Sequence, residues 1–156
     1  MTTISKTFGS QLVDPEALAA FDCLQWLRTG ERAAQLLGCS QSTVSRATRK
    51  CQSVFGVRLV KRAAEWMVEG NAELLKAERR VHHRHRWTTG LPLRLDGQHW
   101  LQSSYADLPL EGWQSGNFNY LEYARPAQLL RDRVLDAWLC SAPDHPQDPD
   151  LVVVRL

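Results

Sequence analysis

Apolar side chains recur with helical spacing in the N-terminal part of the chain. Leu18, Phe21, Leu24 and Leu27 are three residues apart, so they share one face of a helix. Asp14-Pro15-Glu16 precedes this face and places proline near the first helical position and acids at the positive end of the helix dipole. The pattern predicts a helix that begins near residue 15 and buries one face.

A short second helix and a tight turn are predicted next. Ala33 and Ala34 are small enough for another helix to cross closely, and Leu36 and Leu37 supply apolar packing. Gly38 stands where a helix needs a left-handed C-terminal cap, a conformation that costs glycine no Cβ clash.

A third helix follows this turn. Ser40 is a good N-cap because its hydroxyl accepts from the backbone amides of the first turn. Val44, Thr48, Cys51 and Phe55 fall at i, i+4, i+7 and i+11, which makes one inward stripe. This order is the layout of a helix-turn-helix, a motif that puts its second helix into the major groove of DNA.

The polar residues of the third helix suit nucleic acid. Short hydrogen-bonding side chains near its start, and longer cations further on, lie off the buried stripe. Glutamine can pair bidentately with adenine and arginine with guanine, whereas serine and threonine suit bases or phosphates. The alternative is an ordinary amphipathic helix pair whose basic face is solvated.

The same segment resembles the N-terminal pattern of LysR-type transcriptional regulators. That pattern runs Phe-x-x-Val, Ala-Ala-x-x-Leu, Ser-Gln-x-x-Val-Ser and Leu-Gly-x-x-Leu-Phe-x-Arg, and its spacing fits without a gap from Ala33 onward. The matching residues are Phe21 and Leu24, Ala33-Ala34 with Leu37, Ser40-Gln41, Val44-Ser45, Phe55-Gly56, Leu59-Val60 and Arg62.

The resemblance implies a chain of three parts. Residues 1–70 should form a mostly α-helical winged helix-turn-helix domain for DNA binding, with the wing between Val57 and Met67. Residues 71–89 should form a linker and dimerisation helix with a hinge. Residues 90–156 should form a partial α/β lobe that resembles half of a periplasmic-binding-protein-like effector domain.

Residue chemistry and the resemblance together give a DNA-binding set. The side chains expected at base edges in the major groove are Ser40, Gln41, Ser42, Thr43, Ser45 and Arg46. The cations expected on phosphates are Arg49, Lys50, Arg58, Lys61 and Arg62. Arg32, near the start of the second helix, is a further candidate.

Residues 71–87, NAELLKAERRVHHRHRW, have few turn formers after Asn71 and are predicted to be one helix. In the resembled family this helix pairs with its copy in a partner subunit, so we assign dimerisation to its narrow apolar face. That face consists of Leu74, Leu75, Glu78 and Val81. Thr88-Thr89-Gly90 should break the helix and act as the hinge.

The basic run within this helix has two interpretations. His82 and His85 are i, i+3 and could share a metal ion, but their neighbours are cationic and no carboxylate flanks them in the sequence. The run therefore favours a solvated or phosphate-facing patch over a metal site. Protonation of three histidines beside four arginines should loosen the end of the helix below about pH 6, given an unperturbed histidine pKa of ~6.5.

Strand patterns mark the C-terminal part. Leu91–Asp96 alternates like a strand, Asn117–Tyr123 is a second candidate, and Leu129–Leu139 looks like a helix that runs into a buried parallel strand. A last strand is expected at Leu151–Leu156. In the resembled family a ligand cleft lies between two such lobes, so with one lobe we expect no small-molecule effector.

Charge and composition narrow the function class. Residues 1–90 hold 14 lysines and arginines against 8 acids, whereas residues 91–156 hold 5 against 9, so the basic part is the one with the helix-turn-helix. No apolar run reaches the ~20 residues of a membrane span, and no secretory leader is visible, which predicts a cytoplasmic protein. Cysteine spacing and the absence of known catalytic motifs predict no disulfide or metal site, no cofactor and no enzymatic activity.

These observations predict a sequence-specific transcriptional regulator that binds double-stranded DNA as a homodimer or higher oligomer. The alternative is a truncated, regulator-like interaction protein. In that case the α/β lobe or the linker helix binds another regulator subunit, and DNA binding is weak.

Overall fold

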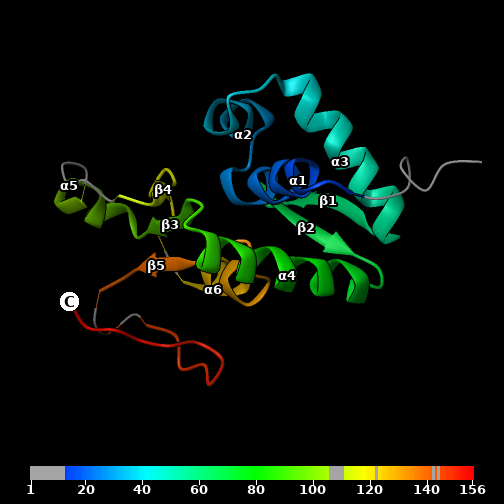
Figure 1. Cartoon of the computed structure of the whole chain (residues 1–156). Helices are drawn as coiled ribbons and strands as arrows, with labels where there is room; N and C mark the ends of the chain where they lie inside the picture. Colours follow the sequence, from blue (N-terminus) through cyan, green and yellow to red (C-terminus); the bar gives the residue numbers. More distant parts are fainter. Residues whose placement is uncertain (1–12, 106–110, 122, 142, 144) are drawn as a thin grey trace, which may run out of the picture. The chain divides into compact units, whose positions relative to one another are not determined.

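The computed structural model describes residues 13–105, 111–121, 123–141, 143 and 145–156, so the start of the sequence and Asp144 lie outside the described residues. The chain divides into two compact units, one up to Leu74 and one from Leu75 onward. The elements of each unit are labelled in Figure 1. The predicted linker, residues 71–89, thus falls mostly within the second unit.

Three helices form the body of the first unit, as predicted. They are α1 (Pro15–Leu27), α2 (Gly30–Leu37) and α3 (Gln41–Phe55). Each begins at a side chain that caps its first turn: Asp14 accepts from the Ala17 amide, Thr29 from that of Arg32 and Ser40 from that of Thr43. Such N-caps satisfy amides that would otherwise lack a partner at the start of a helix.

Helix α1 is the centre of this unit. Its side chains from Ala20 to Leu27 are all buried, and Phe21 and Trp26 are at most 1% exposed. It contacts both α2 and α3, whose buried residues include Ala33 and Cys51. Burial of Leu, Phe and Trp side chains is worth about 1.5–3 kcal/mol each, so this packing fixes how α3 is presented.

A two-stranded antiparallel hairpin forms the predicted wing. Strands β1 (Arg58–Arg62) and β2 (Glu65–Glu69) pair in register from Arg58 opposite Glu69 to Arg62 opposite Glu65. The two turn residues, Ala63 and Ala64, have φ of 47° and 67°. Positive φ at both turn residues is the type I′ arrangement, which matches the twist of a hairpin but favours glycine and asparagine.

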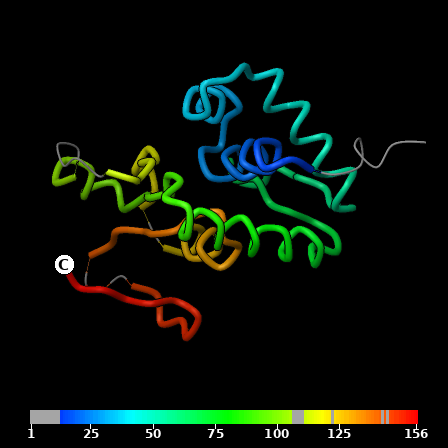
Figure 2. The backbone as a smooth tube through the Cα atoms, viewed as in Figure 1, coloured from blue at the N-terminus to red at the C-terminus, as the bar shows by residue number. Residues whose placement is uncertain are grey.

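The chain leaves β2 through residues 70–72 and enters the long helix α4 (Glu73–Thr89), as the tube in Figure 2 shows. The helix ends at the predicted break, where Gly90 has a φ of 69°. The expectation from sequence that residues 71–87 form a single helix is confirmed.

The second unit is built on a three-stranded parallel sheet with the order β4-β3-β5. Its strands are β3 (Leu93–Gly97), β4 (Trp113–Ser115) and β5 (Ala137–Leu139). A 3₁₀ turn, η1 (His99–Leu101), and the short α5 (Gln102–Tyr105) follow β3, and α6 (Ala124–Arg131) precedes β5. The predicted strand at Leu91–Asp96 and the predicted helix–strand unit before Leu139 are confirmed.

Two predicted strands are wrong. Within Asn117–Tyr123 the described residues form one isolated bridge, Tyr120 with Gln98, and the strand that pairs with β3 lies earlier, at Trp113–Ser115. Phe118 has a φ of 50°, which interrupts an extended chain, and its ring lies where a Cβ on Gly97 would be only 2.6 Å away. Residues 151–156 pair with no strand among the described residues, despite their high β-propensity.

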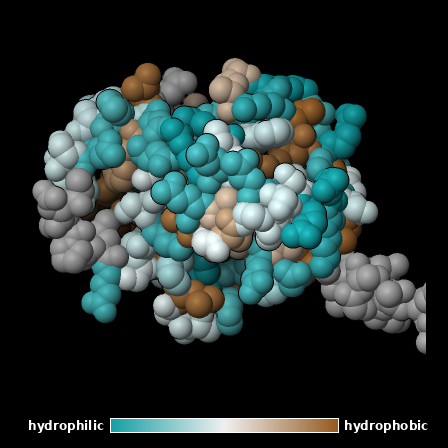
Figure 3. All heavy atoms as spheres, turned by 90° about the horizontal axis from the view of Figure 1, so that it is seen from above, coloured by the Kyte–Doolittle hydropathy of each residue, from teal (hydrophilic) through white to brown (hydrophobic). Residues whose placement is uncertain are grey.

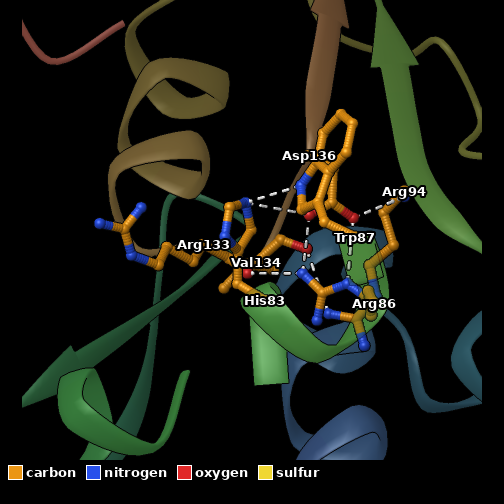
Figure 4. A network of polar contacts seen from close by, with 7 residues as sticks. All are labelled: His83, Arg86, Trp87, Arg94, Arg133, Val134 and Asp136. Carbon is orange, nitrogen blue, oxygen red and sulfur yellow. Dashed lines mark hydrogen bonds and ion pairs between the residues drawn. The ribbon is translucent and has the colours of Figure 1, made fainter. Parts of the chain in front are cut away.

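A buried ionic network holds α4 to the sheet (Figure 4). The carboxylate of Asp136, whose side chain is 0% exposed, accepts two bonds from Arg86, at 2.9 and 3.1 Å, and one from the Arg94 amide at 2.8 Å. His83 Nε2 lies 3.4 Å from the same carboxylate, and Arg86 also donates to the Arg133 carbonyl. Rotation at Thr88–Gly90 therefore requires breaking buried charge-assisted bonds.

Candidate DNA-binding surface

The turn between α2 and α3 follows from local chemistry. Gly38 adopts the left-handed conformation, with a φ of 64°, and its amide contacts the carbonyls of Ala34 and Gln35. The Cys39 amide donates to the Ala34 carbonyl at 3.0 Å, which completes the C-terminal cap of α2. Ser40, with extended backbone angles, then starts α3.

The inward stripe of α3 is the one that the sequence predicts. Val44 is 1% exposed and Cys51 0%, and Thr48 and Phe55 are also buried. The Cys51 thiol donates to the Ala17 carbonyl of α1 at 3.5 Å. This packing fixes the rotation of α3 about its axis, so the opposite side faces solvent.

The opposite side of α3 is polar, cationic and exposed. Ser42, Ser45, Arg46, Arg49 and Ser53 are all exposed and lie on one side at helical spacing. Figure 3 shows the face over α2 and α3 as mostly hydrophilic, with small hydrophobic areas. A helix with this outer face, on a well-packed body, can enter a groove of a nucleic acid without exposing its core.

Hydroxyl groups cluster at the start of α3. Ser40 Oγ lies 2.8 Å from Ser42 Oγ and 2.9 Å from Thr43 Oγ1, and Arg46 reaches Thr43 Oγ1 at 3.4 Å. Gln41, beside this cluster, is exposed. The free amides and the positive dipole end of a helix attract anions, so this end suits a phosphate as well as a base edge.

Lys50 differs from the other predicted phosphate contacts of α3. Its ammonium group lies 3.2 Å from the Asp14 carboxylate at the start of α1. The pKa of Asp14 lies below its usual value, first because the Ala17 amide donates to the carboxylate and then because Lys50 is beside it. Arg49 has no comparable acidic partner among the described residues and points outward.

The wing's cations also have partners within the chain. Arg58 Nη2 donates to Glu69 Oε2 at 3.3 Å, and Arg62 donates to the other oxygen of the same carboxylate. Lys61 Nζ lies 5.4 Å from the centre of the Trp66 ring, within the range of a cation–π contact. Sequence reasoning identified the three cations but missed Glu69, because cross-strand register is set only by the folded hairpin.

Three contacts among the described residues attach the wing to the helices. Trp66 Nε1 donates to the Arg28 carbonyl at 2.9 Å, and the Arg28 side chain lies 2.6 Å from the Glu65 carboxylate. Gln52 Oε1, at the end of α3, accepts from the Leu59 amide of β1 at 2.8 Å. The wing and α3 are therefore linked directly.

The remaining candidates lie elsewhere. Arg32 is exposed on α2. Of the predicted dimerisation residues, Leu74 is 57% and Val81 63% exposed, whereas Leu75 is buried. Glu78 Oε1 lies 2.9 Å from His82 Nε2, so a carboxylate does flank the histidine run, contrary to the expectation from sequence. The expectation failed because Glu78 is four residues away in sequence but adjacent on the helix surface.

Within the described residues there is no group of three or more metal-binding side chains, and no helix there has the length and apolarity to cross a membrane.

Comparison with known proteins finds a family model that matches part of the chain. The model of the bacterial regulatory helix-turn-helix proteins of the lysR family matches residues 15–68, which span α1 to β2. No curated protein matches the chain.

Two solved structures illustrate what the chain is similar to. Full-length OxyR from Pseudomonas aeruginosa, in a variant form, has 17% identity and a TM-score of 0.45, with 81% of this chain and 50% of that chain covered. CrgA, a LysR-type transcriptional regulator from Neisseria meningitidis, has 18% identity and a TM-score of 0.34, with 81% and 48% covered. The chain spans about half the length of these relatives. Residues 15–68 thus match the model of the lysR-family bacterial regulatory helix-turn-helix proteins.

Proposed function

We propose that the chain is a sequence-specific transcriptional regulator that binds double-stranded DNA as a dimer through this helix-turn-helix domain. The observation that carries the proposal is the exposed outer side of α3, where serines and arginines lie opposite a fully buried stripe. The family match of residues 15–68 supports it.

The position of each side chain along α3 suggests its role. Arg46, one turn into the helix and beside the hydroxyl cluster, is suited to guanine O6 and N7. Ser42 and Ser45 lie on the same exposed side, near the helix start that approaches base edges in this motif. Arg49, one turn further on, is suited to a phosphate.

A competition experiment tests the sequence-specific part. Fluorescence anisotropy compares binding of the chain to its own upstream DNA and to a random duplex. Arg46→Ala should weaken binding to the specific site by about 1–3 kcal/mol and leave random DNA nearly unchanged. Arg49→Ala is the matched control on the same face, and should weaken both duplexes alike. Equal losses for Arg46→Ala on both duplexes would remove Arg46 from the base-reading set.

The dimer is proposed from two of the exposed apolar residues of α4. Leu74 and Val81 are seven residues apart, so they recur on one side of the helix and leave apolar area for a second copy. Light scattering of the wild-type chain should give twice the mass of one chain. Val81→Asp puts a charge on the apolar side of α4, so the measured mass should fall toward that of the monomer. A monomeric wild-type chain that still binds DNA would remove the dimer from the proposal.

The second candidate function is an interaction protein that binds another regulator subunit. Glu69 neutralises two of the wing's cations, which favours weak DNA binding. A groove of about 710 Å³ in the second unit, lined by Leu130, Trp138 and residues 151–156, offers an apolar surface for a partner. The measurement is the DNA affinity of the wild-type chain. An affinity that depends neither on the DNA sequence nor strongly on the salt concentration favours this candidate.

A further inference from the structure

The first unit contains a cleft between α1, the turn after α2 and the first half of α3. We call it the α1–α3 cleft. Its volume is about 640 Å³, and sites for small molecules typically span about 300–1,000 Å³. All of its lining residues belong to the first unit, so its shape is set by the packing of these three helices alone.

The floor of the cleft consists of small apolar side chains. Ala17 and Ala20 of α1 and Ala47 of α3 line it and are at most 8% exposed, and the half-buried Ala19 lines it as well. A methyl group fills much less of the space between two crossing helices than a longer side chain does, so these alanines leave the hollow open. The floor therefore offers contact area to an apolar group, as the walls of ligand sites usually do.

The rim of the cleft carries two positive and two negative side chains. Lys50 of α3 and Asp14 at the start of α1 are paired with each other at 3.2 Å. Arg46 of α3 and Glu16 of α1 are both exposed, and neither forms an ion pair with a described residue. Arg46 reaches the Thr43 hydroxyl at 3.4 Å, which leaves most of its guanidinium donors available.

These charges select for a ligand that carries both signs. A ligand with a carboxylate alone meets the uncompensated acid of Glu16, and one with an ammonium group alone meets the uncompensated cation of Arg46. Such like-charge contacts lower affinity and give specificity against singly charged molecules. A zwitterion can satisfy both walls, because a guanidinium binds carboxylates strongly and a carboxylate binds ammonium groups.

We propose that the α1–α3 cleft binds a small zwitterion with an apolar body, of the class of free amino acids, and that this ligand competes with DNA for Arg46. Arg46 holds the ligand carboxylate, Glu16 holds its ammonium group, and the alanine floor contacts its apolar part. The competition rests on the proposed function, in which Arg46 reads a guanine. A guanidinium engaged with the ligand carboxylate is not available to base edges in the major groove.

Binding is measured first without DNA. L-leucine, isocaproate and isoamylamine share one branched apolar body and differ in their charged groups, so calorimetric titration of the full chain with each compares the charges alone. L-leucine should bind more tightly than either analogue. It should also slow alkylation of the free Cys39 thiol, which lines the cleft, and leave the rate at Cys140 in the second unit unchanged.

Two variants outside the proposed DNA contacts test the site. Glu16→Gln removes the acid with little change in shape, so it should weaken binding of L-leucine but not of isocaproate. Glu31→Gln, an exposed acid in the first turn of α2 that does not line the cleft, is the matched control. Ala19→Leu fills the hollow and should abolish binding, and circular dichroism checks that the helices remain.

The competition is measured by fluorescence anisotropy with the upstream duplex. Saturating L-leucine should weaken binding of the wild-type chain to this duplex by about 5–150-fold, the usual range for two linked sites. Glu16→Gln and Ala19→Leu should bind the duplex as wild type does without L-leucine, and should lose most of the response to it.

Each outcome decides part of the inference. If L-leucine binds no better than its two analogues, or if Glu16→Gln and Glu31→Gln behave alike, the zwitterion site is overturned, while the proposed function stands if wild type still prefers its own duplex. Binding of L-leucine that leaves the DNA affinity unchanged overturns the competition for Arg46. A wild-type chain that binds L-leucine but no DNA supports the site and refutes the proposed function together with the competition.

Discussion

In the wing, one acidic side chain, Glu69, lies against two of the arginines that we expect to contact phosphates. Glu69 holds Arg58 and Arg62 through its two carboxylate oxygens, although the side chains of both arginines are at least 70% exposed. A phosphate that approaches either arginine is repelled by this carboxylate and competes with it for the guanidinium. The same residues that suit DNA are therefore partly neutralised by an acid of the same hairpin.

Removing the charge of Glu69 should strengthen DNA binding. Glu69→Gln frees both arginines, so affinity for specific and random duplexes should rise together, and the salt slope should steepen by up to about 1.8. Glu111→Gln, an exposed acid in the second unit, is the control for net charge. If Glu69→Gln behaves like Glu111→Gln, the wing does not contact phosphates.

Elements of the first unit could be predicted from sequence because their signals are local. Asp14, Ser40 and Gly38 are caps that act within one turn, and the Val44 to Phe55 stripe depends only on helical period. The strands of the second unit were harder to predict from sequence, because β4 is defined by its pairing with β3 and not by its own pattern of apolar residues. The partners of Glu69, Lys50 and Asp136 are side chains that only the fold brings together.

The wing turn is an element with avoidable strain. A residue with a Cβ at positive φ costs about 1–2 kcal/mol relative to the right-handed region, and both Ala63 and Ala64 have this conformation. Ala63→Asn/Ala64→Gly places the preferred type I′ pair there and should raise stability by about 0.5–1 kcal/mol.

Thermal unfolding followed by circular dichroism measures this gain. The melting temperature should rise by a few degrees, whereas Ala19→Gly, within α1, should lower it. An unchanged or lower melting temperature for the turn variant would show that the alanines are not strained in solution.

The junction of α4 with the sheet depends on one buried carboxylate. Asp136→Ala leaves Arg86 buried without its partner, and loss of one member of a buried ion pair typically costs about 3–5 kcal/mol. Denaturant unfolding should show this loss, and Arg86→Ala/Asp136→Ala should cost less than the sum of the single variants. The control is Asp148→Ala, which removes the ion pair with Arg131, whose side chain is 42% exposed, and should cost less than Asp136→Ala. Additive losses would mean that the pair is not coupled.

At the scale of the whole molecule, pH should act through His83. Burial lowers the pKa of His83 below its usual value, and the charges of Arg86 and Arg133 lower it further, against the opposing effect of Asp136. The folded protein therefore binds the proton less readily than the unfolded chain. The contribution of His83 to stability is fully present above its unfolded pKa of ~6.5 and is lost as the pH falls below that value.

Unfolding free energies at pH 7.5 and 5.5 test this dependence. Wild type should be less stable at the lower pH, and His83→Gln should reduce the difference. His85→Gln is the control, because His85 is exposed on the same helix. A pH dependence that His83→Gln leaves intact would assign the effect to another group. The sequence predicted loosening from protonation of three histidines beside four arginines, whereas the structure singles out His83, the histidine whose pKa burial lowers.

The bond from the Leu59 amide to Gln52 at the end of α3 has a consequence for which duplexes the first unit accepts. Together with the Trp66 contact to Arg28, it holds the hairpin at a set distance from α3, the helix that we propose enters the major groove. A duplex whose neighbouring minor groove is too wide or too narrow cannot seat both parts at once. Such a domain would discriminate between DNA sequences by their local shape and stiffness, including at base pairs that no side chain touches.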